Sequence, residues 1–325
     1  MNRLLPMHAA RTVAVVLLLS AMGIHAQDYP TKPIRMIVSV PPGGAVDTVA
    51  RMMGQRMAES LKQAIIIENR PGGNSIIAAE AAARSVGDGY TLFMALDITM
   101  TMNPHLYPTL PYDPVKDFAP ISLVNTNTLL VVANPRVPFK SVAELVSYAK
   151  SNPGKVNYGA GTSLGQIAGA LFKSSTGTDV VHVPFKAADP AVQALIRGDI
   201  DVVFGSFASS LNHVRQGRLI AIATTGTDRS KTLPNVPTMK EVGYPAIEVT
   251  GWTALYAPMG APAPIIDRLN REVVRIIGTP EVADKMRAAI SSEPASSTPS
   301  ELAAMQKTDT AKWQTLVKLA GIKAD

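Results

Sequence analysis

The sequence contains no cysteine, few aromatic residues and few charges, and these absences exclude several classes of protein. None of its 325 residues is cysteine, 5% are aromatic and 17% are charged. Without cysteine the chain has no thiol nucleophile, thiolate zinc site, iron–sulfur cluster or disulfide. Its hydrophobic content of 46% is too high for a disordered chain. This length predicts about two globular domains.

The chain also has only a small excess of positive charge. The chain has 31 basic and 25 acidic residues, a net charge of +6, and the basic residues are scattered rather than gathered in a run. A nucleic-acid-binding domain usually shows a basic face or stripe. We therefore expect no nucleic-acid partner. No glycine turn continues into the Gly-Lys-Ser/Thr of a P-loop, and potential metal ligands do not cluster. We expect no cofactor and no metal site.

The first 26 residues have the pattern of a secretory signal peptide. Arg3 and Arg11 precede the short apolar run 12–24, and a cut is expected after Ala26. The run is shorter than the roughly 20 residues of a membrane span, although an uncleaved anchor remains the alternative. Cleavage would leave 299 residues with 29 basic and 25 acidic side chains, a net charge of +4. We expect a soluble, exported protein.

Strand-like and helical segments alternate along the whole chain. In the first part, strands are expected at 34–40, 64–68 and 90–96, and helices at 45–61 and from a cap at Asn74 or Ser75 to residue 84. Two extended runs lie within 113–134. In the second part, strands are expected at 156–158, 180–185, 201–207, 219–224 and 247–257, and helices at 164–174 and 191–197. Helices at 263–278, 281–291 and 300–319 close the chain.

This alternation predicts an α/β fold with mostly parallel sheets. We expect two α/β domains joined by two crossing segments, with the C-terminal helices returning to the first domain. Domain 1 would comprise residues 27–126 and 248–325, and domain 2 residues 127–247. We expect a monomer.

Three glycine-rich turns stand between a strand and a helix, at 42–44, 71–73 and 159–163. A helix N-terminus presents unpaired N–H groups and a partial positive charge, so it can bind a carboxylate or a phosphate. Parallel strands present such turns at their carboxyl ends. Turns from two domains could thus face one another across a cleft, while ordinary turn chemistry explains any single one.

The segment 161–165 also matches Gly-x-Ser-x-Gly, the nucleophile turn of serine hydrolases. Ser163 would be the nucleophile, with Asp199 or Asp201 and then His213 as partners. The chain has no His-Gly-Gly-Gly segment for an oxyanion hole. A hydrolase remains the alternative function.

Several longer motifs resemble the Bug family, the periplasmic solute receptors of tripartite tricarboxylate transporters. They cover essentially the whole chain after residue 26. In order they are Pro42-Gly43-Gly44 with Asp47-Thr48, Glu68-Asn69-Arg70-Pro71-Gly72, Asp88-Gly89-Tyr90-Thr91-Leu92, Leu110-Pro111-Tyr112-Asp113-Pro114, His182-Val183-Pro184-Phe185-Lys186 and Leu233-Pro234-Asn235-Val236-Pro237.

The resemblance implies a type II periplasmic-binding-protein fold that closes like a flytrap over a small organic carboxylate. It also implies an integral membrane permease as partner and no enzymatic activity. In this family the loop after the first strand and the glycine loop of the second domain hold the ligand carboxylate. These loops map to Pro42, Gly43, Gly44 and Asp47, and to Gly161, Thr162 and Ser163.

Side chains at three further positions are expected to contact the ligand: Thr99, Lys186 and Ser206. The chain departs from the family at Ser39-Val40 and at Asp97, where a small hydroxyl residue is usual. These departures leave the identity of the carboxylate open. A sensor with the same fold and a signalling partner is a further alternative.

Overall fold

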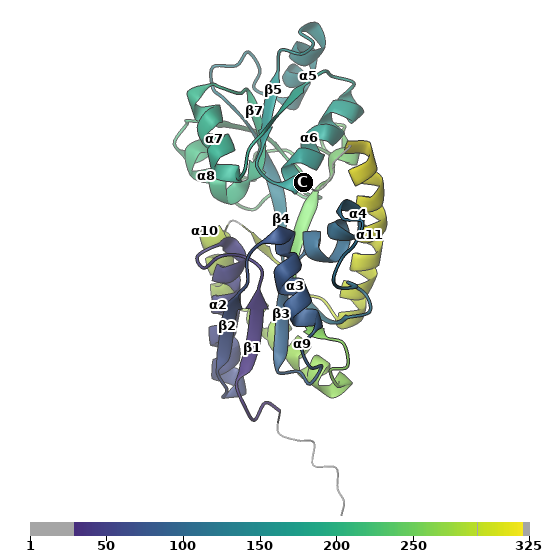
Figure 1. The fold of residues 1–325 in the computed structure, drawn as a ribbon. Helices are drawn as coiled ribbons and strands as arrows, with labels where there is room; N and C mark the ends of the chain where they lie inside the picture. Colours follow the sequence, from purple (N-terminus) through teal and green to yellow (C-terminus); the bar gives the residue numbers. More distant parts are fainter. Residues whose placement is uncertain (1–28, 291, 321–325) are drawn as a thin grey trace, which may run out of the picture.

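Two α/β lobes share a pair of crossing strands in the computed structural model (Figure 1). The structure describes residues 29–290 and 292–320. The predicted signal peptide and its cut after Ala26 lie outside the described residues.

Lobe 1 contains one sheet with helices on both faces. Its strands are β1 (Ile34–Val38), β2 (Ile65–Asn69), β3 (Thr91–Leu96), β9 (Thr250–Pro258), β10 (Glu293–Pro294) and the first part of β4 (Phe118–Ala133). Its helices are α2 (Ala45–Leu61), α3 (Ile76–Ala83), α4 (Asn103–Leu106), α9 (Ala263–Ile277) and α10 (Pro280–Ile290), with short turns η1 (Gly73–Ser75) and η2 (Ile98–Met102). The predicted side-chain cap of α3 is wrong, because Ser75 has a φ of 71° and its hydroxyl accepts no cap bond.

Lobe 2 is built in the same way around the second part of β4. Its other strands are β5 (Asn157–Ala160), β6 (Val181–Pro184), β7 (Val202–Ser206) and β8 (Ile220–Thr224). Its helices are α5 (Val142–Ser151), α6 (Ser163–Thr176), α7 (Ala188–Arg197), α8 (Phe207–Arg215) and the short η3 (Pro245–Ile247). The predicted α/β fold class is confirmed, but the prediction of mostly parallel sheets is wrong. Among the described residues, every strand pair that includes β4 or β9 is antiparallel, because these strands pass between the lobes.

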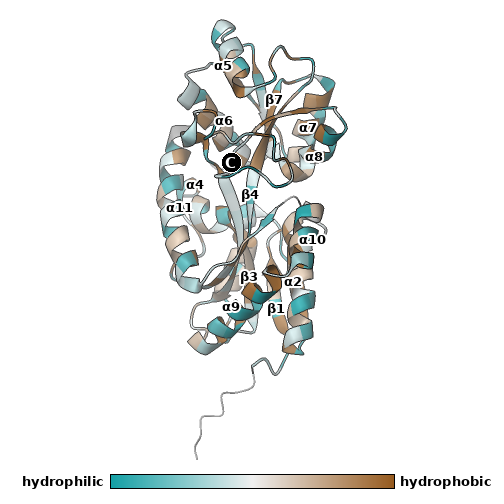
Figure 2. Cartoon of the chain, turned by 180° about the vertical axis from the view of Figure 1, so that it is seen from behind, coloured by the Kyte–Doolittle hydropathy of each residue, from teal (hydrophilic) through white to brown (hydrophobic). Residues whose placement is uncertain are grey.

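A single long strand, β4, replaces the two extended runs predicted within 113–134. Its first part pairs with β9 and its last part, from Leu129, pairs with β7 and β8. The polar stretch Asn125 to Thr128 ends the part that pairs with β9, and here β4 passes from one lobe to the other. Figure 2 shows this middle part of β4 pale to teal, whereas β1 and β7 are brown.

The last helix, α11 (Pro299–Ala320), belongs to both lobes. Leu302 packs with Trp252 and Tyr256 in the core of lobe 1, whereas Trp313 packs in the core of lobe 2 beside Ile167 of α6. Figure 1 shows α11 running along the side of both lobes. The sequence predicts that all C-terminal helices return to the first domain. For α11, only the part around Leu302 packs in the core of lobe 1.

The carboxyl ends of the parallel strands in the two lobes face each other. β3 runs antiparallel to β9, which runs antiparallel to β4, so β3 and β4 run in one direction and β7 in the opposite one. β3 ends at the level of Asn125 of β4, and β7 ends opposite Leu129. These levels are four residues apart, about 13 Å along a strand. Loops that follow β1, β3, β5 and β7 therefore meet across the crossing strands.

Candidate ligand-binding site

Asp47 fastens the loop between β1 and α2. Its side chain is 2% exposed. Oδ2 accepts hydrogen bonds from the Gly43 N–H at 2.8 Å and from Nε of Arg51 at 2.9 Å, and Oδ1 accepts one from Nδ2 of Asn69 at 2.8 Å. Burial raises the pKa of Asp47, but these three donors outweigh it and lower the pKa overall. Both carboxylate oxygens of Asp47 thus accept hydrogen bonds, and the bond from Gly43 holds the loop against the start of α2.

The loop itself presents backbone to the space between the lobes. Pro42 and Gly43 are exposed and Gly44 is half-buried. Gly43 has a φ of 84°, a left-handed conformation that favours glycine. Gly44 stands at the N-cap of α2 and no side chain caps this helix. The N–H groups of the first turn of α2 therefore remain for water or an anion.

Buried hydroxyl groups follow β1 and β3 at the same edge. Ser39 is 4% exposed and Thr99 is fully buried, and neither Oγ atom has a hydrogen-bond partner among the described residues. Because β1 and β3 pair in parallel, Ser39, directly after β1, and Thr99, three residues after β3, both lie beyond the same edge of the sheet. A buried polar group without a partner is costly unless water or a ligand satisfies it. Thr99 was predicted from the sequence; Ser39 was not, although it directly follows a buried strand.

The turn between β5 and α6 is held by close backbone packing. A Cβ atom on Gly161 would lie 1.9 Å from the carbonyl oxygen of Ala187, so only glycine fits there. The Thr162 hydroxyl caps α6 by accepting a bond from the Gly165 N–H at 3.1 Å. Ser163 is the first residue of the helix and is half-buried. The turn thus brings the start of α6 against the loop before α7.

Two other predicted residues take different roles in lobe 2. The hydroxyl of Ser206 caps α8, accepting a bond from the Ser209 N–H at 3.2 Å and lying 2.9 Å from the Ser209 Oγ. Lys186 lies exposed in the loop between β6 and α7. Because β5 pairs in parallel with β6 and β7, all predicted residues of this lobe stand at its carboxyl edge.

The alternative hydrolase triad does not form. Asp201 precedes β7 and its Oδ2 accepts a bond from the Asn157 N–H at the start of β5, whereas Ser163 follows the end of β5. Asp199 is bound to Arg197. Nδ1 of His213 has no hydrogen-bond partner among the described residues. No carboxylate therefore orients this histidine toward Ser163.

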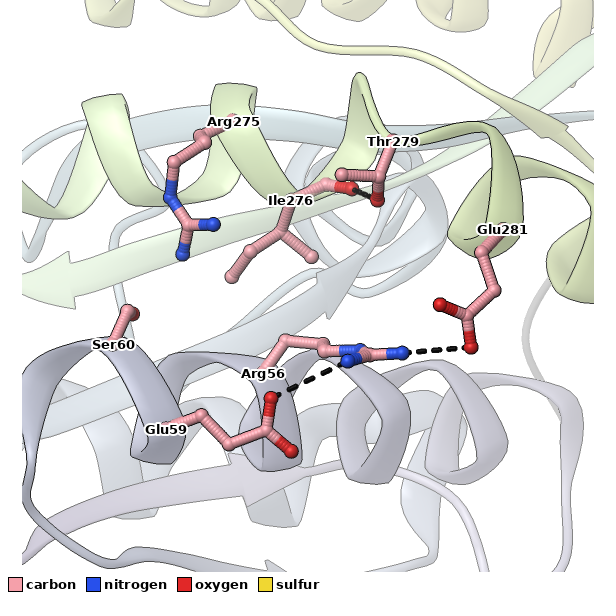
Figure 3. Close-up of a pocket in the computed structure, with 7 residues that line it drawn as sticks. All are labelled: Arg56, Glu59, Ser60, Arg275, Ile276, Thr279 and Glu281. Carbon is pink, nitrogen blue, oxygen red and sulfur yellow. Dashed lines mark hydrogen bonds and ion pairs between the residues drawn. The ribbon is translucent and has the colours of Figure 1, made fainter.

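A pocket of about 310 Å³ has walls from both lobes beside the crossing strands. Thr128 and Thr250 line it from β4 and β9, Phe207 from α8 and Glu293 from β10. Phe207 directly follows Ser206. A different pocket, of about 300 Å³, lies within lobe 1 between α2, α9 and α10 (Figure 3).

The charges of that second pocket are paired with each other. Arg56 lies 3.3 Å from Glu59 and 2.7 Å from Glu281, as the dashed lines in Figure 3 mark. None of the predicted ligand-binding residues lines either pocket. We place the candidate site between the lobes because the strand ends that carry those residues face each other there.

Two general features of the described residues bear on the site. Residues 29–290 and 292–320 contain no group of three or more side chains suited to hold a metal ion. Over the same residues, no helix combines the length and hydropathy needed to cross a bilayer.

Comparison with known proteins identifies the family. Residues 49–322 match the model of the tripartite tricarboxylate transporter family receptor. BugT of Bordetella pertussis is 32% identical over 325 residues, covering 98% of this chain and 99% of that protein. The UPF0065 protein in the tcbD-tcbE intergenic region of Pseudomonas sp. strain P51 is 34% identical over 295 residues, covering 89% of this chain and 86% of its own length.

Solved structures with sequence identity of 30% also share the fold. A protein of R. palustris solved with adipate has a TM-score of 0.79, and the match covers 91% of this chain and 99% of that one. MatC of Rhodopseudomonas palustris, with bound malate, has a TM-score of 0.72, covering 89% of this chain and 100% of the other. The chain belongs to the family of tripartite tricarboxylate transporter receptors.

Proposed function

We propose that this protein is an extracytoplasmic solute receptor that binds a small organic carboxylate between its lobes and delivers it to a membrane permease. The observation that carries the proposal is the facing of two carboxyl edges, each with a helix start behind a glycine turn. Its support from relatives is the adipate and the malate bound in two structures of the same fold.

The proposed site takes contacts from both lobes. From lobe 1 come the backbone of Pro42, Gly43 and Gly44, held by Asp47, and the hydroxyl of Thr99. From lobe 2 come the following residues: Gly161, Thr162, Ser163, Lys186 and Ser206. Backbone N–H groups at helix starts and hydroxyl groups replace water around the carboxylate. Because one ligand then contacts both lobes, its binding favours the closed arrangement.

The same proposal covers the cell compartment, the lack of catalysis and the assembly state. Cleavage after Ala26 would release residues 27–325 into the periplasm as a monomer. No chemistry is assigned to Ser163, whose hydrogen-bonded base is missing. A fluorophosphonate probe is therefore expected to leave Ser163 unlabelled, and labelling that is lost in Ser163→Ala would restore the hydrolase alternative.

A thermal-shift screen tests the proposal. Residues 27–325 are unfolded, dialysed and refolded to remove carried-over ligand, then heated with malate, adipate, citrate, glutamate and benzoate in turn. A ligand present at 100 times its dissociation constant stabilises the native state by about 2.7 kcal/mol, which raises the melting temperature by roughly 5 °C. At least one acid should do so, with no shift from the matching neutral amide. No shift with any acid at millimolar concentration contradicts the proposal.

A further inference from the structure

A buried carboxyl group, one of whose oxygens has no hydrogen-bond partner among the described residues, lies where the lobes meet. Asp97 joins β3 to η2, and its side chain is 7% exposed. The backbone N–H groups of Ile98 and Trp252 approach the carboxyl, yet Oδ2 has no hydrogen-bond partner among the described residues. Trp252 belongs to β9, one of the crossing strands. The carboxyl group of Asp97 therefore lies beside β9, one of the strands that connect the lobes.

Lobe 2 covers this carboxyl group through Leu164. A Cβ atom on Gly251 of β9 would lie 3.2 Å from Oδ2 of Asp97 and 3.3 Å from Cδ2 of Leu164, so both side chains lie close to Gly251. Leu164 is the second residue of α6 and packs with the core of lobe 2. Separation of the lobes would withdraw Leu164 and admit water to Asp97.

The charged groups around Asp97 do not neutralise it. On α11, Asp309 faces it across Trp252, whose Nε1 donates to Asp309 at 2.7 Å. The positive charge of Lys312, also on α11, lowers the pKa of Asp309, although burial raises that pKa overall. On α6, Lys173 is bound to Asp179. From β9 and η2 the nearest groups are the uncharged Trp252, Gly251 and Ile98. Burial, with a smaller contribution from the charge of Asp309, raises the pKa of Asp97 to about 7.

We propose that Asp97 couples closure of the lobes to proton uptake, so that the receptor holds its carboxylate more tightly at acidic than at alkaline pH. This inference rests on the proposed function for the ligand and on the geometry of Asp97 for the proton. One proton from water joins the carboxylate as the lobes close, and it returns to water when they open.

The direction of the pH effect follows from the two environments. In this structure, where Asp97 is buried between the lobes, its pKa is about 7, against an ordinary value of 3.8 for an aspartate in water. Closure is therefore favoured at low pH, and the advantage is lost as pH rises through 7. Between pH 8 and pH 6 the closed form gains roughly tenfold.

The test compares the wild type with Asp97→Asn, an uncharged side chain of the same shape, and with Asp267→Asn, which changes an exposed acid on α9. Malate affinity is measured by calorimetry at pH 6 and pH 8. The wild type and Asp267→Asn should bind roughly tenfold more tightly at pH 6. Asp97→Asn should bind with the same affinity at both pH values. Equal pH dependence in all three proteins overturns the inference.

A second measurement does not require the proposed ligand. The radius of gyration of the ligand-free protein is measured by X-ray scattering at the same two pH values. The wild type should be more compact at pH 6, and Asp97→Asn equally compact at both. If malate binds no variant while the scattering difference appears, the assignment of malate as a ligand fails and the inference stands. If neither protein changes with pH in either measurement, the inference fails.

Discussion

Two buried aspartates at neighbouring strand ends show how surroundings set the behaviour of one residue type. Asp47 receives three hydrogen bonds, one of them from the cation Arg51, and its pKa is lowered. Asp97 has an oxygen without a partner and another acid nearby, and its pKa is raised to about 7. The first is a structural anion that shapes a loop, whereas the second is a group poised to change its charge when its surroundings change.

Replacing Asp47 with alanine should destabilise the fold and weaken ligand binding together. The substitution removes the carboxylate that accepts from the exposed Gly43 N–H, from the half-buried Asn69 amide, which keeps its bond to the Val40 carbonyl, and from Arg51; each such bond is worth about 1 kcal/mol. We expect the free energy of unfolding in urea at pH 7 to fall by about 2 kcal/mol. Because the pKa of Asp47 is lowered, its stabilising effect should vanish as the pH drops below about 4. Asp267→Ala should cost under 0.5 kcal/mol; an equal loss in both variants contradicts this role.

The sequence predicts some of these residue roles but not their long-range partners. Asp47 and Arg51 are four residues apart on one helix, a spacing that favours an ion pair, and the two side chains do form one. Asn69 lies 22 residues after Asp47 in the chain and contacts it only because β2 pairs with β1. The burial of Asp97 under Leu164 depends on how two lobes meet. Local sequence patterns do not predict contacts between residues that are far apart in the chain.

At the scale of elements, the predictions succeed where hydrophobic periodicity is strong and fail where it is interrupted. The helix predicted at 45–61 has the bounds of α2. The polar stretch 125–128 interrupts the hydrophobic pattern, so the sequence predicts two runs instead of the single strand β4. Hydrogen bonding to β9 and then to β7 keeps β4 continuous. α5 has no counterpart among the predicted helices, although Ser141 caps it by accepting from the Glu144 N–H, and Ser-x-x-Glu is a capping box.

The turn before α6 should tolerate no side chain at Gly161. A methyl group there would strike the Ala187 carbonyl, so the turn must move away from the loop before α7. We expect Gly161→Ala to lower the melting temperature and to weaken carboxylate binding at least tenfold. Gly217→Ala is the matched control: its φ is 69° with open space around the new methyl group, so the change costs about 1 kcal/mol of stability. Unchanged ligand affinity in Gly161→Ala would remove this turn from the site.

At the scale of the whole molecule, β4, β9 and α11 join the two lobes. β4 and β9 cross between the sheets, and α11 buries Leu302 in one core and Trp313 in the other. The boundaries 27–126 with 248–325, and 127–247, remain a proposal about how the chain divides. The sequence predicts the two crossing segments, but the strap formed by α11 depends on tertiary packing of an amphipathic helix that could lie on either lobe.

The central claim is that a carboxylate draws the two lobes together, and the absence of cysteine makes it directly measurable. Gln55 on α2 and Gln193 on α7 are exposed and lie one on each lobe, so Gln55→Cys with Gln193→Cys gives two unique labelling sites. The distance between two fluorophores is measured by energy transfer while malate or another acid found in the screen is added. The distance should shorten and its spread should narrow as the acid saturates the protein. An acid that raises the melting temperature but leaves this distance unchanged would contradict binding between the lobes.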